Sequence, residues 1–415
     1  MPFTRLGLSP ALVHAAREHG FLAPTPIQTA AIPLVLQGRD VRAQAQTGSG
    51  KTAAFALPLL QRVQQAARAG EKPRRLRALV LVPTRELAAQ VGATLRDICE
   101  HIAEPLKIVV AVGGVSINPQ MLRLRGGADI VVATPGRLLD LVDHNALKLA
   151  DVATLVLDEA DRLLDLGFAD ELDRILALLP ATRQNLCFSA TFPPAVQKLT
   201  DALLHDPARI DIEPEAARAA QIAQRAIEVD PTRRTALLRQ LILENGWRQV
   251  LVFVASKNAA DNLADKLYRA GIDAAPFHGE LSQGRREQVL ADFKAARWQV
   301  VVATDVAARG IDIAQLPVVV NYDLPRSPTD YVHRIGRTGR AGEAGVAISF
   351  VSAATEAHFR LIEKRQQQRV PRERIAGFEP LDTAPASVSD PDGTGGIKGK
   401  RKSKKDKLRE AAGKT

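Results

Sequence analysis

Short apolar runs recur along the chain, each beside a segment with helical spacing, and they form two series separated by a gap. The first series is Arg77–Pro83, Lys107–Gly113, Asp129–Thr134, Thr154–Asp158 and Asn185–Thr191. The second series is Gln249–Ala255, Asp273–His278, Gln299–Asp305, Pro317–Tyr322 and Val346–Val351. Continuous apolar strands that alternate with helices predict an α/β fold with mainly parallel sheets covered on both faces. Right-handed crossovers then bring the loops after the strands to one edge of each sheet.

The gap between the two series, Leu204–Gln224, contains two prolines and an Ala/Arg-rich stretch without strand character. One large sheet with a surface insertion is an alternative, but each series is long enough for its own core, which favours two domains. We therefore predict an N-terminal region over 1–31, a first domain over 32–208 and a linker over 209–223. A second domain over 224–378 and a basic tail over 379–415 follow.

The composition excludes several classes of protein. With 46% apolar and 25% charged residues among 415, the chain is not wholly disordered. Its apolar runs are far shorter than the roughly 20 residues that a membrane span needs. The two cysteines, Cys99 and Cys187, cannot build a disulfide framework or a four-ligand zinc site. These features predict a cytoplasmic protein that does not insert into membranes.

The net charge of +10 indicates a polyanionic partner, but it is unevenly distributed. Lys398–Thr415 carries nine basic and two acidic residues, so +7 of the charge lies there. Such a segment cannot bury enough apolar surface to fold, and we predict a disordered tail. We expect it to tether a polyanionic partner without sequence preference; incidental solubilising charge is the alternative.

A phosphate-binding loop is predicted at Ala45-Gln46-Thr47-Gly48-Ser49-Gly50-Lys51-Thr52, which departs from the general pattern only at Ala45. The two glycines allow backbone N–H groups to close around phosphate oxygens. Lys51 is expected to reach the outer phosphates of ATP, and the Thr52 hydroxyl to bind Mg²⁺. A flexible Gly/Ser turn is the alternative, and the Gly-Lys-Thr ending disfavours it.

Asp158-Glu159-Ala160-Asp161 follows a buried apolar strand in the same domain. A carboxylate at the tip of such a strand can hold Mg²⁺, and its neighbour can orient or deprotonate water. We assign Asp158 to the metal and Glu159 to the attacking water. An exposed acidic turn is the alternative.

The second series contains His333-Arg334-Ile335-Gly336-Arg337-Thr338-Gly339-Arg340, whose arginines would run along one side of a helix. Guanidinium groups suit phosphate, although a basic helix on nucleic acid would look the same. The strand end and loop Ala303–Asp312 favour a second domain that faces the first across an ATP cleft.

Together these motifs resemble the DEAD-box ATP-dependent RNA helicases of superfamily 2 from about Phe3 to Pro380. The further matching motifs are Gly20-Phe21 with Pro24–Gln28, Pro83–Leu87, Gly113-Gly114, Thr134–Arg137, Ser189–Thr191, Val252–Val254 and Gln283 with Arg286. Within the family, Gly113–Gln120 and Leu124–Gly127 are most similar to the bacterial RhlE subgroup. The resemblance implies two tandem RecA-like domains, with 1–31 as the adenine-reading region, and RNA-dependent hydrolysis of ATP.

The resemblance also implies roles for single residues. Thr25 and Gln28 would read adenine, Phe21 or Phe3 would pack on the base, and Asp312 would contact the ribose. The catalytic group would comprise Lys51, Asp158, Glu159, Arg337 and Arg340. The residues implied to couple the ATP and RNA sites are Asp161, Ser189, Thr191, Arg309 and His333.

RNA contact is implied for Thr84, Arg85, Gly114, Thr134, Arg137, Gln283, Arg286, Thr304 and Gly310. Hydroxyls, glycine-flanked N–H groups and arginine suit a reader of the RNA backbone. An aromatic content of 4% argues against a broad base-stacking surface. Single residues have structural alternatives, since Thr84 is also a good helix start and Gly113-Gly114 a good turn.

The predicted function is RNA-stimulated ATP hydrolysis that separates short duplexes or remodels ribonucleoprotein. Single-stranded RNA and short duplexes, with little sequence specificity, are the predicted partners, in ribosomal or RNA-decay complexes, and the chain is predicted to be a monomer. An ATP-gated RNA clamp and a DNA helicase are the alternative functions.

Overall fold

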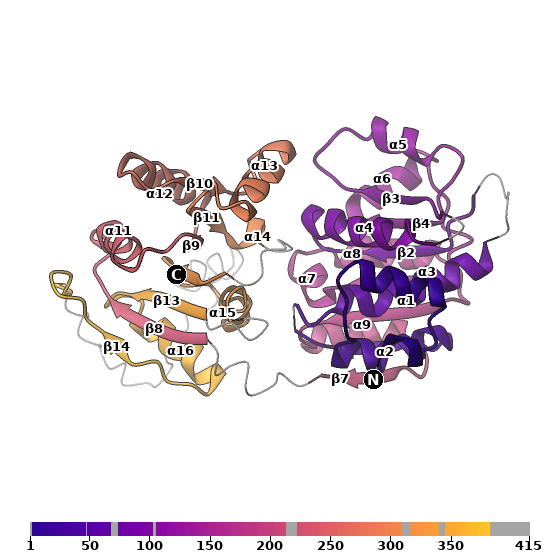
Figure 1. Cartoon of the computed structure of the whole chain (residues 1–415), viewed down its shortest axis with the longest axis horizontal. Coiled ribbons are helices and arrows are strands. Elements are labelled where there is room, and N and C mark those ends of the chain that lie inside the picture. Colours follow the sequence, from indigo (N-terminus) through magenta and orange to yellow (C-terminus); the bar gives the residue numbers. More distant parts are fainter. Residues whose placement is uncertain are drawn as a thin grey trace, which may run out of the picture.

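The computed structural model describes residues 2–46, 48–67, 74–102, 105–212, 222–308, 316–339 and 345–381, apart from the side chain of Val306. Two seven-stranded sheets, both parallel in every pairing, form the centres of two domains that lie side by side (Figure 1). The predicted α/β fold is therefore confirmed. The predicted tail beyond residue 381 lies outside the described residues.

The strands of the first sheet lie in the order β3-β4-β2-β5-β6-β1-β7. Their bounds are β1 Val41–Gln44, β2 Ala78–Leu81, β3 Ile108–Ala111, β4 Ile130–Ala133, β5 Thr154–Asp158, β6 Gln184–Ser189 and β7 Ala208–Asp211. The flanking helices are η1 Phe3–Arg5, α1 Pro10–Glu18, α2 Pro26–Leu36, α3 Lys51–Ala66, α4 Arg85–Cys99, α5 Asn118–Leu124, α6 Pro135–Asp143, α7 Ala160–Asp165, α8 Ala169–Leu178 and α9 Pro194–Leu203.

The two faces of this sheet bury separate clusters of apolar side chains. Along β5, Val156 packs on the side covered by η1 and α1–α4, whereas Leu155 and Leu157 pack on the side covered by α5–α9. A strand that is buried on both faces has no polar alternation, which explains why β5 reads as a continuous apolar run.

The second sheet has the order β10-β11-β9-β12-β13-β8-β14. Its strands are β8 Ile222–Glu228, β9 Val250–Val254, β10 Ala274–Phe277, β11 Val300–Thr304, β12 Val318–Asn321, β13 Gly345–Val351 and β14 Arg372–Glu373. Its helices are α11 Arg234–Asn245, α12 Lys257–Arg269, α13 Gln283–Lys294, α14 Asp305–Ala308, α15 Pro328–Ile335 and α16 Glu356–Gln366.

All ten predicted strands are present, and β1, β7, β8 and β14 are additional. Strand β7 and the start of β8 fall within Leu204–Gln224, the region predicted to join the two domains, and its Ala/Arg-rich stretch lies outside the described residues. Both strands mix charged or polar residues with alanine and isoleucine, and they lie next to or at a sheet edge. None of the helices in the described ranges is long and apolar enough to cross a membrane.

Candidate active site

The predicted phosphate-binding loop connects β1 to α3, and α3 begins at Lys51. Gly48 and Gly50 have φ angles of 80° and 93°, a region that L-residues with side chains seldom adopt. Lys51 is 6% exposed, and its Nζ donates to the carbonyl of Ala45 at 2.8 Å. The Ser49 hydroxyl donates to the carbonyl of Gln46 at 2.8 Å. The loop thus folds around its own lysine, at the positive end of a helix dipole.

Gln28 links the N-terminal region to this loop. Its Oε1 accepts from the N–H of Thr25 at 3.0 Å, and its Nε2 donates to the carbonyl of Gly50 at 3.1 Å. Thr25 precedes α2, so the start of that helix lies beside the start of α3. Phe3 is buried in the core, whereas Phe21 is only partly buried, which favours Phe21 over Phe3 as the aromatic group open to a base.

The acidic segment begins at the end of β5. Asp158 is buried, and its Oδ1 accepts from the N–H of Glu159 at 3.0 Å. The pKa of Asp158 is raised to about 7, mainly by burial; the Lys51 ammonium opposes this rise, and the neighbouring Glu159 charge contributes to it. Glu159 has a φ of 54°, a strained conformation for a residue with a side chain. Such strain occurs where the surrounding structure holds a functional side chain in place.

These residues fit ATP and Mg²⁺. The Lys51 ammonium is buried with a carbonyl as its acceptor, and the pKa of the buried Asp158 is raised. A bound phosphate would pair with the Lys51 charge, and a bound cation would favour the ionised form of Asp158. Within the described ranges, no group of three or more His, Cys, Asp or Glu side chains could hold a metal. A cation here would therefore need phosphate oxygens and the half-buried Thr52 hydroxyl in addition to Asp158.

Asp161, Ser189 and Thr191 form one hydrogen-bonded cluster. The Ser189 hydroxyl accepts from the N–H of Asp161 at 3.2 Å and donates to the carbonyl of Thr191 at 2.7 Å. Thr191 donates to Asp161 Oδ2 from its N–H at 3.0 Å and from its hydroxyl at 2.8 Å. The strand end of β6 is thereby connected to the acidic segment.

Arg162 extends this cluster into the second domain. One of its terminal nitrogens contacts His333 Nδ1, and the other lies 3.9 Å from Asp330 Oδ1. Because a guanidinium only donates, Nδ1 must accept, so the imidazole is neutral with its proton on Nε2. Burial lowers the pKa of His333 to about 3, with a further contribution from the Arg162 charge. A small pocket is lined by both domains here, by Arg162, Phe253, Asp305, Ala308, Asp330, His333, Arg334 and Arg337.

Arg334 and Arg337 do not lie on one helix, contrary to the arrangement considered from their spacing. Helix α15 ends at Ile335, so Arg337 lies in the turn after it. Arg334 makes a bidentate pair with Asp305, with nitrogen–oxygen distances of 2.6 and 2.7 Å, and is 2% exposed. Arg334 and Arg337 both line the interdomain pocket, but the pair that Arg334 makes with Asp305 inside the second domain gives it a structural role.

Comparison with known proteins identifies the family. The model for DEAD/DEAH box helicases matches residues 25–199, and the helicase conserved C-terminal domain matches residues 233–342. RNA helicase CrhR from Synechocystis is 44% identical over 369 residues, covering 89% of this chain and 73% of CrhR. The chain belongs to the DEAD-box ATP-dependent RNA helicases.

Two structures of Dbp5 from S. cerevisiae bear on the arrangement of this helicase. Dbp5 bound to RNA and ADP BeF3 has a TM-score of 0.79 at 32% identity, covering 90% of this chain and 95% of Dbp5. A Dbp5 variant bound to a Gle1 variant and IP6 has a TM-score of 0.70 at 33% identity, with the same two coverages. At almost equal identity and coverage, the arrangement of the helicase resembles the RNA- and nucleotide-bound form more closely.

The predicted RNA residues of the first domain lie in the loops and helix starts after β2, β3 and β4. The guanidinium of Arg85 lies directly over Gly114, where a Cβ atom would collide with it. Arg137 donates to the carbonyl of Val115 at 2.8 Å. Thr84 Oγ1 accepts from the N–H of Leu87 at 3.2 Å, so Thr84 does cap α4. Thr134 precedes α6 without a side-chain capping bond.

In the second domain, Gln283 and Arg286 lie in the first turn of α13, and Thr304 ends β11. Five predicted site residues lie outside the residues that the structure describes: Thr47, Arg309, Gly310, Asp312 and Arg340. Arg162 and Glu86 both contact the second domain and were not predicted from the sequence. Each directly follows a predicted site residue, but adjacency alone does not distinguish an interdomain contact from a solvated charge.

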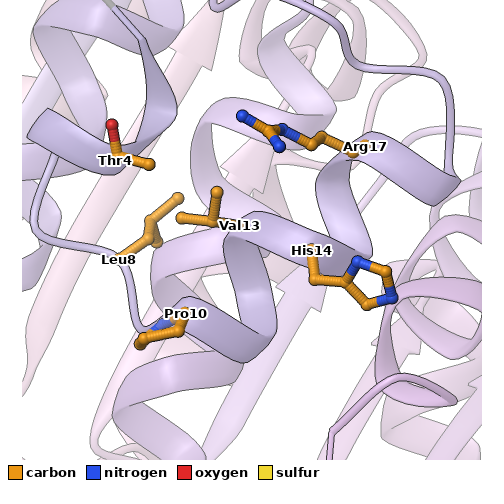
Figure 2. Close-up of a pocket in the computed structure, with 6 residues that line it drawn as sticks. All are labelled: Thr4, Leu8, Pro10, Val13, His14 and Arg17. Carbon is orange, nitrogen blue, oxygen red and sulfur yellow. The ribbon is translucent and has the colours of Figure 1, made fainter.

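A larger, open pocket of about 260 Å³ lies away from these motifs in the helicase, around η1 and α1. Figure 2 shows its lining, which is Thr4, Leu8, Pro10, Val13, His14 and Arg17. It contains none of the predicted site residues.

Proposed function

We propose that this helicase hydrolyses ATP at the β1–α3 loop, with hydrolysis stimulated by RNA, and thereby separates short duplexes locally or remodels ribonucleoprotein. The observation that carries this proposal is the continuous chain of contacts from Asp161, Ser189 and Thr191 through Arg162 to His333. These contacts connect the acidic segment Asp158–Asp161 of the first domain directly to the second domain.

The first-domain residues would bind and orient the reactants. Lys51 would bind the outer phosphates, and Thr52 and Asp158 would hold Mg²⁺, which when bound neutralises phosphate charge. Glu159 would orient a water molecule and accept its proton while the water oxygen bonds to the γ-phosphorus and the bond to the bridging oxygen breaks. The products are ADP and phosphate. Thr25, Gln28 and Phe21 would hold the adenine, and Asp312 the ribose.

The second domain would complete the site when the cleft closes. Arg337 and Arg340 would stabilise the charge on the γ-phosphate, a contribution worth about 10³–10⁵ in rate for an arginine supplied in this way. RNA bound by Thr84, Arg85, Gly114, Thr134 and Arg137, and by second-domain residues, would favour the same closed state. By linkage ATP and RNA then strengthen each other's binding. Little sequence preference follows from contacts to phosphate and sugar.

A duplex-unwinding assay separates this function from an RNA clamp whose hydrolysis serves only release. Glu159→Gln keeps the size of the side chain but removes the proton acceptor. We expect the variant to bind RNA in the presence of ATP, to lose turnover, and to release few RNA molecules per protein. If wild type and Glu159→Gln separate short duplexes over many cycles equally, turnover is not required. ATPase stimulation by single-stranded DNA equal to that by RNA would instead favour a DNA helicase.

We further propose that the helicase acts as a cytoplasmic monomer on ribosomal or RNA-decay complexes, with the domain boundaries predicted from the sequence. RNA crosslinking in cells would identify the complexes, and sedimentation at micromolar concentration would test the monomer.

A further inference from the structure

Glu86 and Arg286 form an ion pair between the two domains. Glu86 lies in the first turn of α4 and Arg286 in the first turn of α13. These two helices lie on the sides of the domains that face each other (Figure 1). Arg286 approaches Glu86 Oε1 to 3.0 Å, and the two side chains are only 7% and 8% exposed. Ion pairs that are this well shielded are strongly sensitive to the loss of one partner.

The second domain holds Arg286 ready for this contact. Its guanidinium carbon lies 5.1 Å from the centre of the Phe277 ring, at the end of β10. Burial lowers the pKa of Arg286, the Arg85 charge lowers it further, and Glu86 opposes both. Arg85 and Arg286 are thus two cations from opposite domains that lie near one carboxylate, and Glu86 offsets their repulsion.

The pair lies among the residues predicted to contact RNA, but Glu86, unlike those residues, carries a negative charge. A carboxylate repels phosphate, so Glu86 is not suited to bind the RNA backbone. Glu86 directly follows Arg85, whose guanidinium covers Gly114, and Arg286 shares its helical turn with Gln283. A contact at this place can form only when the domains approach each other.

We propose that Glu86 is a positioning residue that binds Arg286 on closure and thereby couples ATP binding to RNA binding. This inference rests on the proposed function and extends it, since the resemblance assigns Arg286 to RNA alone. The pair would lower the free energy of the closed state only. In the open state both side chains would be hydrated and independent.

The test measures the affinity of a fluorescent single-stranded RNA for the full chain by anisotropy, with and without ADP and beryllium fluoride. Wild type should bind RNA more tightly with the nucleotide analogue. Glu86→Gln should reduce this enhancement at least tenfold. Its affinity without nucleotide should not fall, because the substitution removes a charge that repels phosphate. Glu171→Gln, a matched loss of one carboxylate from the first turn of α8, should retain the wild-type enhancement.

A double-mutant cycle distinguishes the pair from separate roles. If Glu86 and Arg286 act on each other, Glu86→Gln with Arg286→Gln should lose less than the product of the two single losses. Multiplicative losses, or an unchanged enhancement in Glu86→Gln, would refute the pairing while leaving the proposed function intact. A wild-type protein without any enhancement would refute the proposed coupling itself, and this inference with it.

Discussion

Replacing Arg162 with Met tests the contact that joins helix α7, at the end of the acidic segment Asp158–Asp161, to the second domain. Methionine keeps much of the length and apolar stem of the side chain but has no donor. His333 Nδ1 would lose its partner, and Asp330 its nearby cation. The hydrogen bonds of Asp161 with Ser189 and Thr191 would remain, because none of them uses the Arg162 side chain.

The size of the effect follows from the burial of the contact. Arg162 is 7% exposed in its side chain, so water cannot replace it at His333 without opening the pocket. A hydrogen bond to a charged group contributes about 1.5–3 kcal/mol, which is a factor of roughly 10–150 in an equilibrium constant. We expect the equilibrium constant between the closed and open forms, measured with RNA and ADP beryllium fluoride, to fall by that factor, and the closed fraction to fall accordingly. Arg162→Lys should recover part of it, because an ammonium can serve one partner but not both.

Fluorescence transfer between the two domains measures the closed fraction. Cys99 and Cys187 are buried, so dyes can be directed to cysteines placed at the exposed Leu178 and Leu361. Arg174→Met is the matched control, because Arg174 pairs with Asp143 at 3.6 Å on the surface of the first domain. A closed fraction in Arg162→Met equal to that of wild type would refute the reasoning. So would an equal loss in Arg174→Met.

Two further predictions concern pH and the phosphate loop. In the closed form the pKa of His333 is about 3, whereas the pKa of a hydrated histidine is near 6.5. Below pH 6.5 the open form therefore binds a proton at His333 that must be released when the domains close. RNA affinity with ADP beryllium fluoride should therefore be full above about pH 6.5 and weaken by up to tenfold per pH unit below it. A His333→Asn variant whose RNA affinity falls with pH as steeply as that of wild type would contradict this. In Gly50→Ala, the new Cβ would lie 2.5 Å from Gln28 Nε2 at a φ of 93°. We expect the left-handed backbone at this position to destabilise the loop conformation by about 1–2 kcal/mol when the residue is alanine. Binding of a fluorescent ATP analogue should be at least tenfold weaker. Gly284→Ala, which has open space around its Cβ, is the control and should bind normally.

The strands and the loop chemistry could be predicted from local pattern, because both depend on neighbouring residues. A fully buried strand such as β5 is apolar throughout, and a phosphate loop needs its glycines and lysine within a few positions. Strands next to or at a sheet edge such as β7 carry a mixed pattern, so they were not predicted. The end of α15 at Ile335 was also missed, because the regular spacing of the arginines gives no sign of the turn at Gly336.

Which charged residue acts across the domains was decided by the tertiary structure alone. In the sequence, Arg334 and Arg337 look alike, as do Arg162 and any surface arginine of a helix. In the folded protein Arg334 pairs with Asp305 of its own domain. Arg162 and Glu86 of the first domain instead contact His333 and Arg286 of the second domain. The physical reason is that an ion pair depends on distances of a few ångströms and on exclusion of water, and both are properties of packing between segments far apart in the chain.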